Sequence, residues 1–342
     1  MERFLPQQDE LSHFINSHAL ALYQQLQSIR VEDLKLDTHY LEYFRSSHYK
    51  RLFFSIETSA QLLYRGIVLK KKPASDIVIM DYGAGIGTLF ILAKMIGCKK
   101  VIYNDLFEDW KYSAQEILRA LGMNVDEYIV GDIDSTLEKL ATKQIQCDII
   151  ASRNVMEHIY KIDVFFAAIH KHQPTAIIYS STTANYYNPA THIQHVMMHR
   201  RYESVFLQQR KELIMKNSPS LSASVIDKVS KKTRGLGADE FSKVAIDPES
   251  YNHLYPVKKV YTNTCDPYNG VWAEHLMPFS QYRMLIGSQY SIRFEPGFWD
   301  THYNRRIMNV LAGIFNAVIR MNKTIGIMLA PFIYVIAIPR QK

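Results

Sequence analysis

The sequence predicts an α/β protein with a mostly parallel sheet and helices on both of its faces. Two observations carry this prediction. Between residues 76 and 181, five short apolar runs alternate with amphipathic runs, at a spacing that fits right-handed strand–helix–strand connections. The first apolar run also ends in the turn "DYGAGIGTL", which begins at Asp81 and leads straight into a helix-like segment.

Length and composition are those of an ordinary globular protein. The 342 residues can bury a sizeable core, as one large domain with insertions or as two domains. Hydrophobic residues make up 47% of the chain and charged residues 21%. The net charge of +7 comes from Lys and Arg spread along the chain. We therefore expect a solvated basic surface and no nucleic-acid partner.

Neither a disulfide framework nor a membrane span is expected. Cys98, Cys147 and Cys265 lie far apart and form no CxxC pair, so no zinc site is predicted either. The N-terminus lacks the apolar core of a signal peptide. Residues 325–339 are the strongest apolar stretch, but they include Pro331 and fall short of the ~20 residues that a span needs. We interpret them as a buried strand with its lead-in, and expect a reducing, cytoplasmic protein.

The elements follow in order. Residues 1–70 predict a helical cap, because apolar residues recur there at helical spacing. The period then changes, and residues 71–183 predict a core of alternating strands and helices. Its strands are expected at 77–81, 100–105, 127–132, 147–152 and 176–181. Its helices are expected near 87–97, 109–122, 135–143 and 159–172.

Residues 184–272 interrupt this rhythm. They are polar, rich in Tyr, His, Arg and Asn, and hold helical pieces without a repeated strand pattern. We interpret them as a lid or substrate-binding insertion. The core pattern returns over 273–342. It predicts a helix, a strand, a second helix and a last strand at 279–288, 289–299, 304–322 and 331–339.

The glycine turn indicates the ligand. In open parallel sheets, ligands bind beyond the carboxyl ends of the strands, and glycine lets the backbone approach them closely. Gly83, Gly85 and Gly87 form GxGxG, with Asp81 ahead, whereas dinucleotide-binding GxGxxG would place glycine or alanine where this chain has Thr88. This pattern resembles that of class I S-adenosylmethionine (SAM) methyltransferases. The resemblance covers about 76–181 and 279–338 in sequence.

The resemblance implies a Rossmann-like sheet of seven strands with an antiparallel last strand, N-terminal helices and a helical lid. It implies SAM as cofactor and S-adenosylhomocysteine as product. Three further pairs would join the glycine turn, at the ribose, the adenine and the methionine part of SAM respectively: Asp105 with Leu106, Asp132 with Ile133, and Arg153 with Asn154. Asp105 could instead cap the next helix, and Asp132 could be a turn acid. The phrases "RGLGADEF" and "YTNTCDPYNGVWAEHL" resemble bacterial members of the same superfamily.

Methyl transfer needs an aligned acceptor and, for many acceptors, a group that removes its proton. His158 follows the fourth predicted strand directly, so topology places it near the cleft. Glu274 and His275 form a second candidate acid–base pair in a turn-rich loop. The alternatives are a packing histidine at 158 and a structural turn that closes the insertion.

His192, His195 and His199 would share one face of a helix. They could line an acceptor pocket or serve the structure. We predict no metal site, because no further ligand pattern accompanies them. Cys265 is not expected to act as a nucleophile, since methyl transfer needs none.

The sequence thus predicts a SAM-dependent methyltransferase that methylates an O or N atom of a small polar metabolite in an enclosed pocket, in biosynthesis. Three alternatives stay open: SAM-dependent chemistry other than methylation, such as intramolecular cyclisation; methylation of RNA or protein; and a binding module with a relict fold. The acceptor and the oligomeric state are undefined, and a homodimer is compatible with the sequence.

Overall fold

The computed structural model describes residues 3–237 and 263–340, and within them a single seven-stranded sheet. Its strand order is β3-β2-β1-β4-β5-β7-β6. The strands are β1 (Val78–Tyr82), β2 (Lys100–Asp105), β3 (Glu127–Val130), β4 (Ile149–Arg153), β5 (Ile177–Thr182), β6 (Tyr290–Pro296) and β7 (Ile333–Pro339). The first five pair in parallel, and β7 lies antiparallel between β5 and β6. The expected fold class, including the antiparallel last strand, is confirmed.

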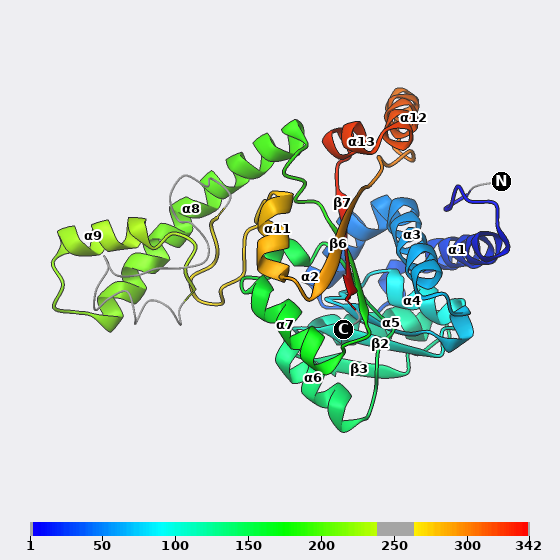
Figure 1. Ribbon diagram of the computed structural model, residues 1–342, viewed down its shortest axis with the longest axis horizontal. Coiled ribbons are helices and arrows are strands. Elements are labelled where there is room, and N and C mark those ends of the chain that lie inside the picture. The colour runs from blue at the N-terminus through cyan, green and yellow to red at the C-terminus, as the bar shows by residue number, and fades with distance from the viewer. Residues whose placement is uncertain (1–2, 238–262, 341–342) are drawn as a thin grey trace.

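Helices cover both faces of this sheet (Figure 1). Before the insertion they are α1 (Glu10–Ser28), α2 (Thr38–Tyr43), α3 (Leu52–Lys70), α4 (Leu89–Met95), α5 (Glu108–Ala120), α6 (Ile133–Thr142) and α7 (Ile162–His172). Shorter helical turns lie at Val31–Asp33, Phe44–His48, Tyr49–Arg51, Ala74–Asp76 and, as η5, Met156–His158. The helices after β5 are α8 (Pro189–Asn217), α9 (Ala223–Lys232), α11 (Phe279–Ile286), α12 (Arg306–Met321) and α13 (Lys323–Leu329).

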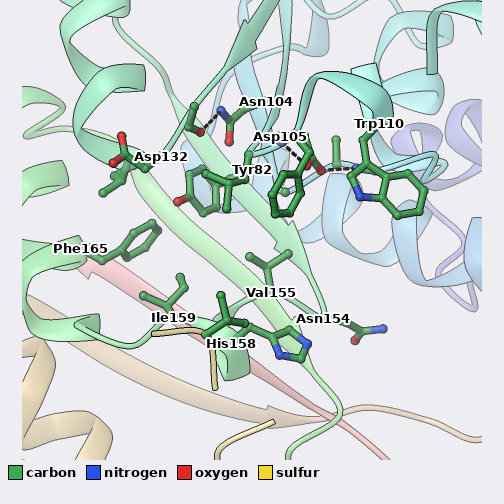
Figure 2. A pocket seen from close by; sticks show the side chains of 18 of the residues that line it. Tyr82, Asn104, Asp105, Trp110, Asp132, Asn154, Val155, His158, Ile159 and Phe165 are labelled. Carbon is green, nitrogen blue, oxygen red and sulfur yellow. Dashed lines mark hydrogen bonds between the residues drawn. The ribbon is translucent and has the colours of Figure 1, made fainter. Parts of the chain in front are cut away.

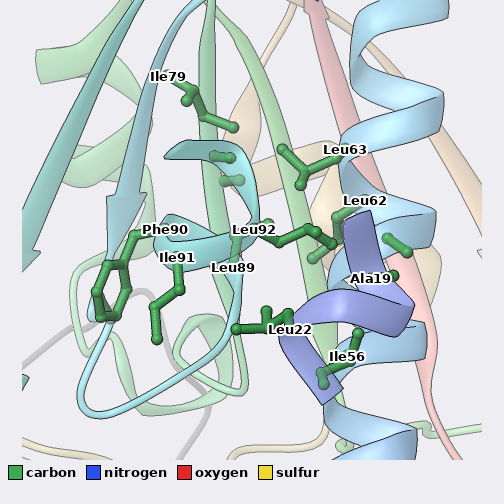
Figure 3. Close-up of a cluster of buried hydrophobic side chains, with 14 of the residues drawn as sticks. Ala19, Leu22, Ile56, Leu62, Leu63, Ile79, Leu89, Phe90, Ile91 and Leu92 are labelled. Carbon is green, nitrogen blue, oxygen red and sulfur yellow. The ribbon is translucent and has the colours of Figure 1, made fainter. Parts of the chain in front are cut away.

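Alternating strand residues divide the core into two layers. Ile79 of β1 packs with α1, α3 and α4, whereas its neighbour Met80 packs with α6, α7 and α11. This is the period of two that a strand covered on both faces requires. Figure 3 shows the first layer, in which Leu22 of α1, Leu63 of α3 and Leu92 of α4 belong to the same cluster as Ile79. The N-terminal helices therefore share one continuous core with the sheet.

The insertion departs from the sheet. Asn188 caps α8 by accepting a hydrogen bond from the Thr191 amide, and α8 then runs for 29 residues. Together with α9 it projects as an arm away from the sheet (Figure 1). Buried Arg210 ties the two helices, because its Nε donates to the Ser230 carbonyl at 2.9 Å. Residues 238–262 of the predicted lid, including the end of "RGLGADEF", lie outside the described residues.

Most expected boundaries agree with the structure within a few residues, and two differences have clear causes. The third strand ends at Val130 rather than at 132, because Asp132 caps α6 by accepting from the Ser135 amide at 3.0 Å. The lead-in to the last strand is helix α13, which Asn322 caps at its start. None of the described helices is long and apolar enough to cross a membrane.

Leu63 provides a test of the shared core. It is fully buried where α3 meets the sheet, so Leu63→Ala should lower the free energy of unfolding by about 2–5 kcal/mol. Val68→Ala is a control on the same helix, since Val68 is 49% exposed and its truncation should change stability by less than about 0.5 kcal/mol. Urea denaturation measures both. Equal small effects would contradict a core that spans cap and sheet.

Candidate functional site

A cavity of about 840 Å³ lies at the carboxyl ends of the parallel strands. The turns that follow β1, β2, β3 and β4 all contribute to its wall. In Figure 2, Asp105 and Trp110 lie on one side of Tyr82 and Asp132 on the other, with His158 opposite them beyond Val155. This is the edge at which open parallel sheets bind ligands.

The glycine turn lies against this cavity and needs its glycines for different reasons. Gly83 has φ of +66°, and a Cβ there would come within 2.6 Å of Val155 Cγ2. Gly85 has φ of +52°, but a Cβ there would meet no atom within 4 Å. A Cβ at Gly87 would lie 2.8 Å from the Ala84 carbonyl oxygen. Gly85 thus leaves open space on the cavity side of the turn.

Asp105 holds the turn in place from the end of β2. Its Oδ2 accepts a hydrogen bond from the Gly85 amide at 2.9 Å, and its Oδ1 accepts from the Phe107 amide at 3.2 Å. Burial raises the pKa of Asp105, although these amides act in the opposite direction. Asp105 does not cap the next helix, because α5 begins after Phe107. The Asp105 carboxylate also lines the cavity and has acceptor capacity beyond these bonds.

Leu106, Asp132 and Ile133 line the same cavity. Leu106 is exposed, and Ile133 is buried at the first turn of α6. Asp132 is the N-cap of that helix, and the hydrogen bond from Ser135 holds its pKa below the ordinary value. Its turn-acid role is therefore real, and it coexists with a position at the cavity wall.

Arg153 and Asp81 form a buried charged group beneath the turn. Arg153 Nη1 donates to three hydroxyls, those of Ser55 and Ser59 at 3.0 Å and that of Thr88 at 3.1 Å. Burial raises the pKa of Asp81 to about 7, while Arg153 and the Phe90 amide act to lower it. Burial likewise lowers the pKa of Arg153. Among the described residues, Arg153 Nε has no hydrogen-bond partner.

Asn154 and His158 follow β4. Asn154 has φ of +55° and its amide donates to the Ser181 carbonyl at 2.9 Å, so the chain turns sharply at the cavity edge. His158 ends η5 and lines the cavity. Its Nδ1 lies 2.8 Å from the Trp272 carbonyl oxygen, which can only accept. The proton of a neutral ring therefore sits on Nδ1, and Nε2 keeps its lone pair.

Glu274 and His275 are not among the residues that line the cavity. Glu274 instead pairs with His195 of α8, with 2.6 Å between Oε2 and Nε2. His275 stacks on Trp272 at 4.5 Å and is 2% exposed. Glu274 also has φ of +58°, a strained backbone for a residue with a side chain. The structure thus brings Glu274 to His195 rather than into an acid–base pair with its neighbour.

A second histidine and a second glutamate complete this network. His199 Nε2 donates to the Glu274 carbonyl at 3.1 Å, its Nδ1 accepts from the Thr264 amide, and burial lowers its pKa to about 3. Glu157 is fully buried, which raises its pKa, and its Oε1 accepts from Thr183. The network therefore joins α8 and the 263–277 loop to the end of β4.

His192 stands apart from the other two histidines of α8, with its Nδ1 3.1 Å from the Tyr186 carbonyl oxygen. Only His195 and His199 turn inward, so the expected shared face holds two histidines. In residues 3–237 and 263–340, no three His, Cys, Asp or Glu side chains are grouped so that they could hold a metal ion.

Sequence reasoning missed part of the wall. Trp110 of α5 lines the cavity and packs against Tyr43 at 5.3 Å between ring centroids. The 263–277 loop contributes residues 268–271 to the wall, while its Trp272 and His275 are buried. Ser55 also lines the cavity from α3. The spacing of Ser55 and Ser59, one turn apart on the same face of a helix, was the available signal.

The His195–Glu274 pair makes stability depend on pH. Burial acts to lower the pKa of His195, but Glu274 outweighs it and the pKa is raised above 6.5. The hydrogen bond from His195 lowers the pKa of Glu274 below 4.5. The pair therefore contributes fully between pH 4.5 and 6.5, and loses its contribution as pH rises through the His195 pKa or falls through that of Glu274.

Glu274→Gln should therefore lower the free energy of unfolding by about 1.5–3 kcal/mol near pH 6. The difference from wild type should shrink toward about pH 9, because His195 Nδ1 faces the Thr191 carbonyl and neutral His195 then has no Nε2 proton to donate. Urea denaturation at both pH values measures this. Glu138→Gln, on the exposed side of α6, is the control. A difference that is independent of pH would refute the ion pair.

No family model and no curated protein matches the sequence. Solved structures that are similar to it include a SAM-dependent methyltransferase from Mesorhizobium loti (18% identity, TM-score 0.28, 37% of this chain and 57% of that chain covered). Another is a ribosomal protein L11 methylase from Lactobacillus delbrueckii subsp. bulgaricus (19% identity, TM-score 0.29, 36% of this chain and 60% of that chain covered). A third is a SAM-dependent methyltransferase from Agrobacterium tumefaciens (12% identity, TM-score 0.30, 37% of this chain and 44% of that chain covered).

These matches span only 44 to 60% of the three proteins, and at such scores they transfer neither a reaction nor a substrate to this chain. The fold is assigned by the sheet itself, with five parallel strands, an antiparallel last strand and a glycine turn after β1. This protein has the fold of the class I SAM-dependent methyltransferases.

Proposed function

We propose that this protein is a SAM-dependent methyltransferase that acts on an O or N atom of a small polar acceptor. One observation carries the proposal. The glycine turn after β1 and the acids after β2 and β3 line a single cavity, together with the arginine that ends β4. SAM needs charged partners at its methionine end and hydrogen-bond acceptors at its ribose and its adenine. The residues at the ends of β1 to β4 offer groups of these types.

The methionine end of SAM matches the charged group beneath the glycine turn. It carries a carboxylate and an ammonium, and the cavity holds Arg153 beside Asp81. Arg153 lines the cavity, so its positive charge can stabilise a bound carboxylate. A bound ammonium would stabilise the ionised form of Asp81, whose pKa burial has raised.

The ribose and adenine match the next two turns. Asp105 keeps lone pairs at the cavity wall and can accept from ribose hydroxyls, as acids at this strand end do in dinucleotide folds. Asp132 can accept from the adenine amino group, and Ile133 offers an apolar surface to the ring. The open side of Gly85 gives the ligand room to pass between these turns.

The acceptor side is formed by His158 and the 263–277 loop. SAM, when bound, supplies an activated methyl group, so the chain must mainly orient the acceptor and remove its proton. His158 suits the second task because the Trp272 carbonyl fixes its tautomer and leaves Nε2 as the basic atom. Glu274 acts from behind this layer, through the packing of its loop, and has a positioning role.

The cavity favours a small acceptor over a macromolecule. Trp110, Tyr160 and Tyr268 contribute aromatic walls, and the 840 Å³ volume lies within the range of ordinary small-molecule sites. An RNA substrate would call for a continuous basic groove, whereas Arg153 and Lys161 are the only Arg and Lys residues of the cavity wall in the described residues.

Asp105→Asn should weaken binding of SAM and of S-adenosylhomocysteine about 10- to 100-fold, because the amide accepts less well from ribose hydroxyls. Isothermal calorimetry on the full chain measures this. Asp126→Asn is the matched control, since Asp126 accepts from the Val101 amide at the other end of β2. No SAM binding by folded wild type, or equal binding by Asp105→Asn, would refute the cofactor site.

His158→Gln should leave SAM binding unchanged and reduce methyl transfer about 10²- to 10⁴-fold, the usual contribution of a general base. Acceptors can be found by incubating the protein with methyl-labelled SAM and fractionated metabolites, with mass spectrometry of the products. His192→Gln, on α8 and outside the cavity wall, should retain full activity. Unlabelled products would instead favour SAM chemistry other than methylation.

A further inference from the structure

The hairpin of α12 and α13 directs a stripe of apolar side chains toward the solvent. This hairpin, residues 306–329, lies between β6 and β7, and its two helices run side by side beyond the tips of those strands (Figure 1). The outer stripe of α12 consists of Ile307, Val310, Leu311 and Ile314, at helical spacing, with exposed fractions of 44% or more. A helix that served only to cover a core would direct such residues inward.

The two asparagines of α12 face inward instead. Asn316 accepts from the Trp299 amide at 2.7 Å and donates to the Trp299 carbonyl at 2.8 Å. Asn309 makes the same double contact with the Tyr303 backbone, at 2.7 and 2.9 Å. Ala312, between these two asparagines on the same stripe, is buried. The apolar stripe is therefore held outward by specific hydrogen bonds.

The hairpin is also closely packed and hydrogen-bonded to its surroundings. A Cβ at Gly326 would lie 2.7 Å from the Ile319 carbonyl oxygen, so α13 packs closely on α12. Trp299 Nε1 donates to the Leu329 carbonyl at 2.9 Å, and Asn185 Nδ2 donates to the Ile327 carbonyl at 2.7 Å. Ile325 and Met328 of α13 are 46% and 49% exposed, and they extend the apolar surface. The position of the outer apolar face is thus fixed by the packing and hydrogen bonds of the hairpin.

The segment that forms this face is basic in sequence. Residues 301–340 contain five basic residues and no Asp or Glu. Arg305 and Arg306 stand exposed at the start of α12, and Lys323 stands exposed at the start of α13. Arg320 follows Asn316 by four residues, on the inward stripe, where its charge opposes the rise that burial causes in the pKa of Glu57. Cations at a helix N-terminus oppose the helix dipole, and Arg305 makes no side-chain capping bond, so the first pair does not serve helix stability.

We propose that the outer face of the α12–α13 hairpin docks on the surface of an anionic lipid bilayer. The apolar stripe enters the boundary between headgroups and acyl chains, and Arg305, Arg306 and Lys323 contact the headgroup phosphates. A second copy of the chain fits less well, because its hairpin would bring the same cations against these without any acid to pair them. The nearest acid in sequence, Asp300, is buried beside Arg51.

Sedimentation of the full chain with vesicles tests this proposal. The protein should partition onto vesicles that mix phosphatidylcholine with phosphatidylglycerol, and far less onto phosphatidylcholine alone. Arg305→Gln with Arg306→Gln should reduce partitioning about 30-fold, at roughly 1 kcal/mol for each charge. Val310→Gln with Ile314→Gln should reduce it at least about tenfold.

The matched control is Ile193→Gln with Met197→Gln on α8. These side chains are 61% and 63% exposed, comparable with Val310 at 62%, but they lie outside the hairpin. Circular dichroism verifies that each variant is folded. No partitioning by wild type would overturn the proposal, as would equal losses in the control. A lipid-free dimer that Val310→Gln with Ile314→Gln dissociates would also overturn it, and would assign the face to self-association.

Discussion

The structure depends on how it accommodates one buried cation. Arg153 ends β4 beneath the glycine turn, where burial lowers its pKa and an unsatisfied guanidinium would be costly. Three hydroxyl groups accept hydrogen bonds from its guanidinium, one from Thr88 at the start of α4 and two from α3. This single side chain therefore connects the helical cap, the glycine turn and the sheet. Because each hydroxyl is also bonded within the group, none of them can move alone.

The same group also shapes the wall of the proposed cofactor site. Asp81 accepts from the Phe90 amide and so sets the first turn of α4, while its charge is held close to Arg153. Asp105 stabilises the glycine turn in a similar way from the end of β2, because it accepts a hydrogen bond from the Gly85 amide. Residues that a nucleoside ligand would contact are thus the residues that shape the turn. A substitution at either acid affects both properties, which is why calorimetry needs a folded control at the far end of β2.

The fold was largely predictable from the sequence because its signals are local. Alternating apolar runs, such as the one that ends at Asp81, mark the strands directly. The glycine turn after the first strand then indicates the edge of the sheet at which a ligand would bind. Side-chain partners were harder to predict, because they come from distant segments. Glu274 and His195 are 79 residues apart, and no sequence pattern links them. Ser55 likewise reaches Arg153 across 98 residues.

The strand order also has a consequence for synthesis. β7 lies between β5 and β6 and pairs with both, so it fills the gap in the sheet last. Until residues 333–339 have left the ribosome, β5 has an open edge and β6 has no neighbour at all. Unpaired edges of this kind attract other chains. The nascent protein therefore passes through a stage in which the edge of β5 is open to pairing with other chains.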